Sequence, residues 1–274
     1  MSVPGGKGSN QAIAAARAGA RCSIVAAVGD DGHAALIRAA LSGAGIDTTE
    51  LRTVGGPSGI ALIVVDDSGR NSIVVVPGAN GRLSSLSTAQ LEMIRGAGVL
   101  LLQLEIPLDT VIAAAEAARG LRILNAAPAR SLPPELVRLI DLLVVNQEEA
   151  SIVTGGPGDA EREAMRLLDL TASVAITLGA DGVLYRDRGG ARHRVMAPRA
   201  HAVDSTAAGD TFTGVLAATL GGGMPVAQAL EMACAAASLA VETIGASSSI
   251  PARASIEARW EAAYGSQRVP LGER

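Results

Sequence analysis

Short, nearly continuous apolar runs alternate along this chain with longer stretches in which apolar residues recur at helical spacing. Continuous apolar runs of this length are typical of strands buried on both faces, as in a parallel sheet. The predicted strands are Cys22–Val28, Val99–Gln103, Arg122–Asn125, Asp141–Val145 and Val174–Leu178. The predicted helices are Gln11–Ala18, Ala34–Ala44, Leu108–Ala118, Glu161–Leu168, Thr211–Leu220 and Val226–Thr243. This alternation predicts a doubly wound α/β fold, with helices on both faces of a mostly parallel sheet.

Two segments depart from this alternation, because no helix separates their apolar runs. The first joins Ser58–Val65 to Ser72–Val76 through the polar turn Asp66–Asn71, which predicts a β-hairpin. We expect this hairpin to leave the sheet as a lid or a dimer surface; an extra edge of the sheet is the alternative. The second hairpin, Val183–Tyr185 with Arg192–Met196, is predicted to extend the sheet edge.

The composition of the chain indicates a single large domain. It has 274 residues, of which 49% are hydrophobic and 18% are charged, and this is enough for one α/β core. One Trp, two Tyr and one Phe are its aromatic residues, so the core must consist of Ala, Val, Leu and Ile. We expect one domain over residues 1–265, with 57–77 as the lid insertion and 266–274 as a frayed tail.

Charge and hydropathy exclude several classes of function. A net charge of −4 without a basic stripe argues against nucleic-acid binding. No run of about 18 apolar residues is free of charge and glycine, so no membrane span is predicted. The segment Met1–Lys7 lacks the apolar region of a signal peptide. Cys22 and Cys234 have no metal-ligand spacing and are expected to be reduced thiols of a cytoplasmic protein.

The segment Asp204–Gly214 carries the strongest chemical signal. In it, Asp210 directly follows the small-residue turn Ala207–Gly209, and an apolar run of helical spacing comes next. A turn that opens a helix directs several N–H groups at one point, so it can hold an anion. A carboxylate beside that anion can take a proton from an incoming hydroxyl. The segment therefore predicts transfer of a phosphoryl group to an alcohol.

A glycine-rich helix start, Gly5–Gln11, opens the chain. It is not a Walker A loop, because Lys7 is followed by Gly8 rather than by Ser or Thr. Lys7 and Asn10 together suit a polyhydroxylated or phosphorylated ligand. A plain helix start is the alternative interpretation.

Further polar residues follow predicted strands, where ligands of open α/β sheets bind. Glu105 follows one strand, and Asn146 and Glu149 follow another. Asn and Glu oxygens suit magnesium or its water shell, whereas an N-cap Asn with a dipole-favouring Glu is the alternative. The glycines of Thr177–Gly182 could admit a flat ligand, and a plain hairpin turn is equally compatible with them.

Together these segments resemble the ribokinase-like carbohydrate kinases, also called the phosphofructokinase-B family, and within that family the ribokinases most closely. Gly5–Ala12 and Asp204–Gly214 are similar to its N-terminal and C-terminal signatures. The segments that lie between them in the family's order are Gln103–Pro107, Asn125–Arg130, Asn146–Glu149 and Thr177–Gly182. The resemblance covers nearly the whole chain, and the two signatures together are highly specific.

The resemblance implies a kinase that transfers a phosphoryl group from ATP to a sugar hydroxyl, first of all the 5-hydroxyl of D-ribose, in ribose catabolism. A kinase for another sugar or a nucleoside is one alternative. A shortened homologue that binds nucleotide without turnover is another. The resemblance further implies magnesium, an activating potassium ion and a homodimer formed through the lid hairpin.

The resemblance also assigns roles to individual residues. Asp210 would be the catalytic base, and the N–H groups of Ala207, Ala208, Gly209 and Asp210 would hold the migrating phosphoryl group. Sugar-binding positions would be Gly6, Lys7, Asn10, Glu105 and Asp210. Nucleotide-binding positions would be Asn146, Thr177, Leu178, Gly179, Ala180, Asp181, Gly182, Gly209 and Asp210. Glu149 would bind magnesium through water, and Cys234 would stand where many relatives stack a histidine on adenine. The potassium ligands would be Asp204, Thr206, Ala240, Thr243, Gly245 and Ser249.

One departure from the family concerns the start of the chain. Family members carry roughly thirty more residues before the Gly-Gly-Lys-Gly segment, by analogy with the fold. Those residues would supply the first strand of the sheet, an Asn and Asp pair that grips the sugar, and half of the lid. Here Met1 stands four residues before Gly5, which implies either a start codon assigned too late or a true truncation. We therefore expect this chain to lack that first strand, to be less stable than a full homologue and to bind sugar weakly.

Overall fold

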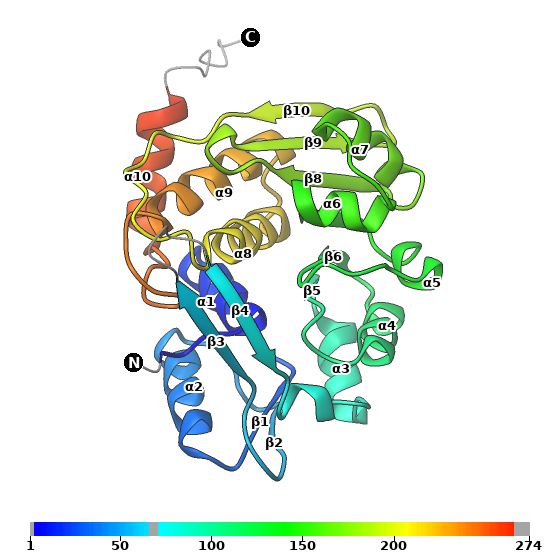
Figure 1. Cartoon of the computed structure of the whole chain (residues 1–274), viewed down its shortest axis with the longest axis vertical. Coiled ribbons are helices and arrows are strands. Elements are labelled where there is room, and N and C mark those ends of the chain that lie inside the picture. The colour runs from blue at the N-terminus through cyan, green and yellow to red at the C-terminus, as the bar shows by residue number, and fades with distance from the viewer. Residues whose placement is uncertain (1–2, 66–70, 266–274) are drawn as a thin grey trace.

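The computed structural model describes residues 3–65 and 71–265, and its largest sheet has six strands (Figure 1). The strands lie in the order β10, β9, β8, β7, β6, β5. Their bounds are β5 Val99–Leu102, β6 Leu121–Asn125, β7 Leu142–Asn146, β8 Ser173–Thr177, β9 Val183–Asp187 and β10 Arg192–Val195. Strands β5 to β8 pair in parallel, whereas β9 and β10 pair antiparallel. The predicted parallel sheet and the predicted edge hairpin are both confirmed.

Successive residues of the central strands face opposite sides of this sheet. On β7, Leu142 and Val144 belong to one buried apolar cluster, whereas Leu143 belongs to another. Side chains alternate in this way on any strand, and here both faces are covered. The need to bury both faces explains why the sequence of β7 is continuously apolar rather than alternating.

Helices cover both faces of the sheet. Those of the first cluster are α1 Lys7–Arg17, α2 Gly32–Gly43, α8 Ala208–Gly221, α9 Val226–Ala240 and α10 Arg253–Tyr264. Those of the second are α3 Thr88–Gly96, α4 Leu108–Ala117, α5 Pro134–Val137, α6 Gln147–Thr154 and α7 Ala160–Leu168. Two short 3-10 helices are η1 Asn80–Arg82 and η2 Gly179–Asp181. In the part of the chain that the structure describes, no helix is both long and apolar enough to cross a bilayer.

Some helix boundaries differ from the prediction, because groups distant in sequence bind the helix ends. Helix α1 begins about one turn early, at Lys7. Its N-cap residue, Gly6, takes a φ of 94°, which glycine adopts readily, and Glu105 accepts the Lys7 N–H. Helix α9 ends before the predicted Thr243, and the carbonyl of Val241 instead accepts N–H groups from the segment before α8. Tertiary contacts thus decide where these helices stop.

Strand β1 (Ala26–Val28) does not join the large sheet. It pairs in parallel with β2 (Leu51–Thr53) as a sheet of two strands, with Ala26 opposite Leu51. The predicted strand Cys22–Val28 is confirmed in its last residues, and Ser23 adds an isolated bridge to Asp47. Among the described residues, parallel strand pairing therefore occurs in two sheets, the mixed six-stranded sheet and this two-stranded one.

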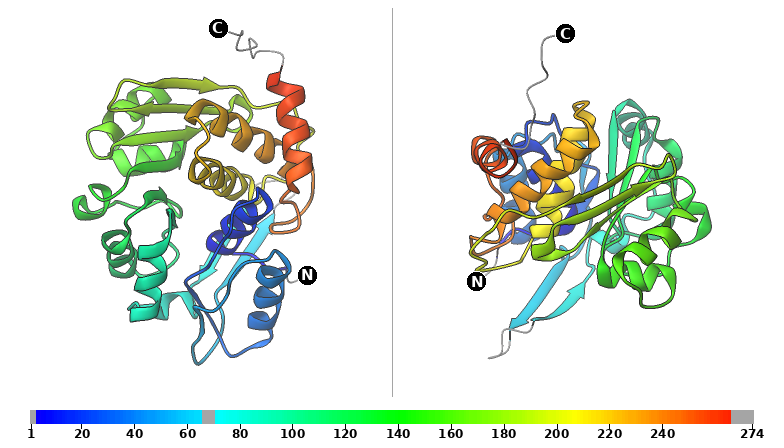
Figure 2. Two further views of the ribbon diagram at one scale, coloured as in Figure 1. Left: turned by 180° about the vertical axis from the view of Figure 1, so that it is seen from behind. Right: turned by 90° about the horizontal axis from the view of Figure 1, so that it is seen from above.

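The first predicted hairpin forms a third sheet, made of β3 (Ile60–Val65) and β4 (Asn71–Val76). Ile60 lies opposite Val76 in an antiparallel ladder. The hairpin projects from the body of the molecule, as the right-hand view of Figure 2 shows. It thus leaves the large sheet, as expected. Most of its predicted turn, residues 66–70, and the predicted tail, residues 266–274, lie outside the described residues.

Candidate active site

A cavity of about 2230 Å³ lies where α1, the start of α8 and the carboxyl ends of β5 to β8 come together. It also extends along the edges of β1 and β5. The predicted site residues that line it are Gly6, Lys7, Asn10, Glu105, Asn146, Glu149, Thr177, Thr206, Ala207, Gly209 and Asp210. Segments from both ends of the chain and from its middle therefore share one site.

The other predicted site residues lie outside the described lining of this cavity. They are Leu178, Gly179, Ala180, Asp181, Gly182, Asp204, Ala208, Ala240, Thr243, Gly245 and Ser249. Cys234 is buried in the core, where burial, together with the charge of Glu231, raises the pKa of its thiol to about 12. Cys234 is therefore not among the residues that line this cavity.

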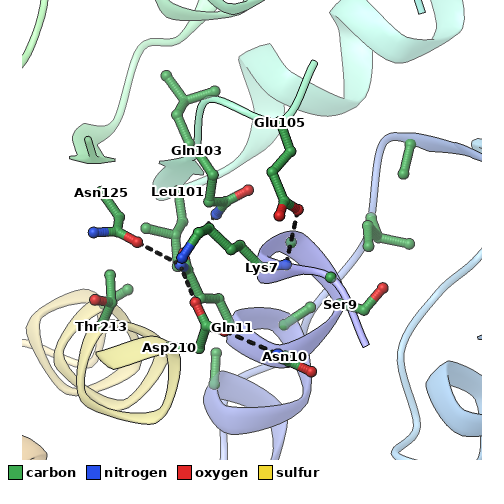
Figure 3. A pocket seen from close by; sticks show the side chains of 18 of the residues that line it. Lys7, Ser9, Asn10, Gln11, Leu101, Gln103, Glu105, Asn125, Asp210 and Thr213 are labelled. Carbon is green, nitrogen blue, oxygen red and sulfur yellow. Dashed lines mark hydrogen bonds between the residues drawn. The ribbon is translucent and has the colours of Figure 1, made fainter. Parts of the chain in front are cut away.

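Asp210 lies in the first turn of α8 and is 7% exposed. Its two carboxylate oxygens each accept a hydrogen bond from α1 (Figure 3). Asn10 Nδ2 donates to Oδ2 and Gln11 Nε2 donates to Oδ1, both at 2.9 Å. A carboxylate oxygen accepts up to two hydrogen bonds, so Asp210 is held in place and can still receive a ligand hydroxyl.

Three amides around Asp210 were not predicted as site residues. Gln11 also donates to Asn125 Oδ1 at 2.9 Å, and Gln103 Nε2 donates to Gln11 Oε1 at 2.6 Å. Figure 3 shows these side chains converging on Asp210 from α1 and the ends of β5 and β6. One signal in the sequence could have indicated Gln11: it is a polar residue before the apolar run Ala12–Ala16.

Glu105 binds the N-terminus of α1. Its Oε2 accepts the backbone N–H of Lys7 at 2.9 Å, which supplies the cap that Gly6 has no side chain to provide. Burial raises the pKa of Glu105, and the negative charge of Asp210 raises it further. The hydrogen bond from the Lys7 N–H and the positive charge of the Lys7 side chain act in the opposite direction. Glu105, Lys7 and Asp210 therefore interact electrostatically within one site.

The N-terminus of α8 has an unusual backbone. Its N-cap, Ala207, takes φ 60° and ψ 8°, and it is the one non-glycine residue with positive φ among those described. No described side chain caps this helix. The N-cap residues of α1, α4, α5, α9 and α10 likewise make no side-chain cap bond, so the backbone conformation of Ala207 is what distinguishes α8. First-turn N–H groups have no partner inside a helix. The Ala208 N–H donates to the Ser205 carbonyl at 3.2 Å. The N–H groups of Gly209 and Asp210 have no partner among the described residues and are thus positioned to bind an anion beside Asp210.

Asn146 and Glu149 form a reciprocal capping box at the start of α6. Asn146 Oδ1 accepts the Glu149 N–H, and Glu149 Oε2 accepts the Asn146 N–H, both at 2.8 Å. The N-cap alternative is therefore confirmed. Burial raises the pKa of Glu149, which also experiences the charges of Lys7 and Asp210. The capping box does not exclude a ligand role, since both residues line the cavity.

The glycines after β8 are explained by local packing. Residues Gly179–Asp181 form η2 between β8 and β9. Gly182 takes φ 84°, and a Cβ there would lie 1.9 Å from the Val195 carbonyl oxygen. The hairpin-turn alternative is thus confirmed for the backbone, and Gly182 is required whether or not a ligand approaches.

Asp204 links the segment before α8 to the loop after α9 by hydrogen bonds. Its Oδ1 accepts the Thr206 N–H at 2.8 Å and its Oδ2 accepts the Gly245 N–H at 2.9 Å. Burial acts to raise the pKa of Asp204, but these hydrogen bonds outweigh it and lower the pKa. Among the described residues no group of three or more His, Cys, Asp or Glu side chains could hold a metal ion.

Comparison with known proteins gives consistent matches. A model of the pfkB family carbohydrate kinases matches residues 2–253. The ribokinase of Haemophilus influenzae is 40% identical over 91% of this chain and 84% of its own length. The deoxyribokinase of Salmonella typhi is 35% identical over 90% of this chain and 84% of its own length. The structure of Arabidopsis thaliana ribokinase complexed with ribose and ATP superposes with a TM-score of 0.91 at 34% identity, covering 95% of this chain and 88% of that chain.

Proposed function

This chain belongs to the pfkB family of carbohydrate kinases, which phosphorylate a sugar hydroxyl, and on that basis we propose that it phosphorylates D-ribose at the 5-hydroxyl with ATP. One observation carries the proposal. Asp210 lies buried in the first turn of α8, beside N–H groups that no described side chain caps, and Asn10 and Gln11 hold it. A base next to an anion site is the arrangement that phosphoryl transfer to an alcohol requires.

In the proposed reaction Asp210 is the general base. As the sugar oxygen forms its bond to the γ-phosphorus, Asp210 takes the hydroxyl proton. The bond between the γ-phosphorus and the β,γ-bridging oxygen breaks, and ADP leaves with the electron pair. The N–H groups of Ala207–Asp210 would hold the negative phosphoryl oxygens during the transfer, aided by the positive end of the α8 dipole.

The sugar would bind among Gly6, Lys7, Asn10 and Glu105. A specific observation supports this: Asn10 is 5% exposed, and its Oδ1 is buried with no hydrogen-bond partner among the described residues. A buried acceptor without a donor is unfavourable, and a sugar hydroxyl would supply that donor. The carboxylate of Glu105 adds an acceptor on the other side of Lys7.

The nucleotide would extend from the start of α8 towards Asn146 and Thr177, which line the same cavity, with the backbone of 178–182 beyond them. Glu149 would hold magnesium through a water molecule, and the ion would neutralise phosphate charge. Potassium would bind near Asp204, with carbonyl or hydroxyl oxygens supplied by Thr206, Ala240, Thr243, Gly245 and Ser249. By ordering the start of α8 it would support the anion site.

Residues 1–265 would act as one domain, with the β3–β4 hairpin as a lid and a homodimer contact. The described part of the hairpin exposes apolar side chains on both of its faces. Leu62, Val74 and Val76 share one face and Val75 lies on the other, and all four are 48–57% exposed. An apolar surface of this kind on an unpaired hairpin is typical of an interface.

ADP release in a coupled assay tests the proposed function. We expect turnover with ATP and D-ribose, higher in potassium than in sodium at equal ionic strength. Because one relative is a deoxyribokinase, 2-deoxyribose is the second candidate substrate, and the panel includes a hexose and inosine. Asp210→Asn should remove turnover and leave ATP binding intact. ATP binding without turnover on any substrate would indicate a non-catalytic nucleotide-binding protein instead.

A further inference from the structure

A fully buried amide on α1 links Asp210 to the sheet. Gln11 has 0% exposure, and its Nε2 donates to Asp210 Oδ1 and to Asn125 Oδ1. Its Oε1 accepts from Gln103 Nε2. We propose that Gln11 is a positioning residue that holds the Asp210 carboxylate in the orientation needed to accept the sugar proton. This inference rests on the proposed role of Asp210 as the base.

The direction of the hydrogen bonds in this network is determined from its far end. Asn125 Nδ2 donates to the Val144 carbonyl of the neighbouring strand at 3.2 Å. Because a carbonyl only accepts, the amide nitrogen of Asn125 must face Val144, and its oxygen must face Gln11. Gln11 must then present its nitrogen to Asn125 and Asp210, and its oxygen to Gln103. The side-chain amide of Gln11 thus donates both of its N–H groups, one of them to Asp210, the proposed base.

The contact between α1 and α8 fixes the position of Gln11 relative to Asp210. Gly214 lies one turn after Asp210, so both are on the same face of α8. A Cβ at Gly214 would lie 2.3 Å from the Gln11 carbonyl oxygen and 2.7 Å from Ala14 Cβ. The two helices therefore touch backbone to backbone, which leaves the Gln11 side chain little freedom to move.

Gln11 and Asn10 bind the same carboxylate but have different surroundings. Asn10 lines the cavity next to an unsatisfied acceptor, so it can contact both the base and the sugar. The Gln11 side chain has no exposed surface, and each of its amide atoms is already engaged. It therefore acts on the reaction through Asp210. Loss of Gln11 should lower kcat and leave the KM for ATP unchanged, whereas loss of Asn10 should also raise the KM for the sugar.

The substitution Gln11→Met tests this inference, because Met keeps the length of the side chain and removes both donors. We expect kcat to fall roughly 10- to 100-fold, the range that misplacement of a catalytic group produces. The KM for ATP should stay within about twofold of the wild-type value. Gln11→Glu, which has nearly the same shape but turns acceptors towards Asp210, should lose more activity than Gln11→Met.

Gln90→Met is the matched control. Gln90 is also a fully buried glutamine, but it binds Ser87 and the Glu50 carbonyl, and none of these three residues lines the cavity. The Gln90→Met substitution should lower the unfolding temperature and leave kcat unchanged. Gln103→Met removes only the donor to Gln11 Oε1 at a half-buried position, and it provides a second measurement if Gln11→Met does not fold. It should give a smaller loss of kcat at the wild-type unfolding temperature.

The outcomes separate this inference from the proposed function. If the wild type is active and Asp210→Asn is inactive, but Gln11→Met or Gln103→Met keeps the wild-type kcat, Gln11 does not position the base. The same holds if Gln90→Met lowers kcat as much as Gln11→Met, because the effect then follows stability alone. An inactive wild type would overturn the proposed function itself.

Discussion

Replacing Gly214 by alanine should impair catalysis more than stability. The added Cβ would lie 2.3 Å from the Gln11 carbonyl oxygen, 2.7 Å from Ala14 Cβ and 3.1 Å from Ala15 N. Real Cβ atoms essentially never approach closer than 3.0 Å, so the helices must separate by about 0.7 Å. No flexible side chain is available to yield, because backbone and a methyl group make the contacts.

The two consequences of this separation differ in size. Overpacking costs about 1–3 kcal/mol, and alanine regains roughly 1 kcal/mol over glycine inside a helix. The net loss of stability should thus be about 0–2 kcal/mol, or a few degrees in Tm. The same displacement stretches the bonds from Asn10 and Gln11 to Asp210, which are 2.9 Å long. We expect kcat to fall roughly 100-fold, which is the loss that misplacement of a catalytic group by about 1 Å produces.

Thermal unfolding and coupled ADP release measure these two effects. Gly43→Ala is the control, because nothing lies within 4 Å of a Cβ at that helical position in α2; it should leave kcat unchanged and Tm equal or slightly raised. If Gly214→Ala retains the wild-type kcat, the argument that helix contact aligns the base is refuted.

Three other predictions follow from local geometry. Gly182→Ala should destabilise the protein by about 2 kcal/mol or more in chemical denaturation, because its Cβ would lie 1.9 Å from the Val195 carbonyl at φ 84°; wild-type stability would contradict this. Hydrogen bonds from the Ser58 N–H and hydroxyl lower the pKa of Asp31 to about 2 from 3.8. Their stabilisation is therefore complete above pH 3.8 and should disappear as the pH falls towards 2; acid unfolding of Asp31→Asn should lack this component, and an unchanged acid transition would refute it. Leu62→Ser should weaken any dimer formed through the hairpin, measured by sedimentation velocity, and an equal dissociation constant would exclude that interface.

Elements with a strong pattern were predictable from the sequence, because burial on both faces requires continuous apolar residues. Strands β6, β7 and β8 lie within a residue or so of their predicted bounds. Helix α10 was missed since Ile256 and Tyr264 are its buried residues, too few to produce a periodic signal. Helix α3 was also missed, although Ser87 and Gln90 form a capping box at its start. Short or half-exposed helices therefore depend on tertiary packing that no local pattern records.

The candidate site was predictable in part. Lys7, Asn10, Glu105 and Asp210 were expected and line one cavity. Gln11 was not expected, since a polar residue before an apolar run is common at the start of a helix and does not indicate which groups it will bind. Gln11 becomes part of the site through its hydrogen-bond partners, which lie 92 to 199 residues away in the sequence.

By itself, the sequence determined the chemical groups of this site and the local turns that present them. A small-residue turn before a helix exposes N–H groups wherever it occurs, because those groups lack partners within the first turn. Only the tertiary structure decided how the groups are aligned. Gly214 lets α1 and α8 touch, and the contact brings Asn10 and Gln11 to opposite oxygens of Asp210. The physical reason is burial: away from water each amide must find a protein partner, and those partners meet only when the whole chain has folded.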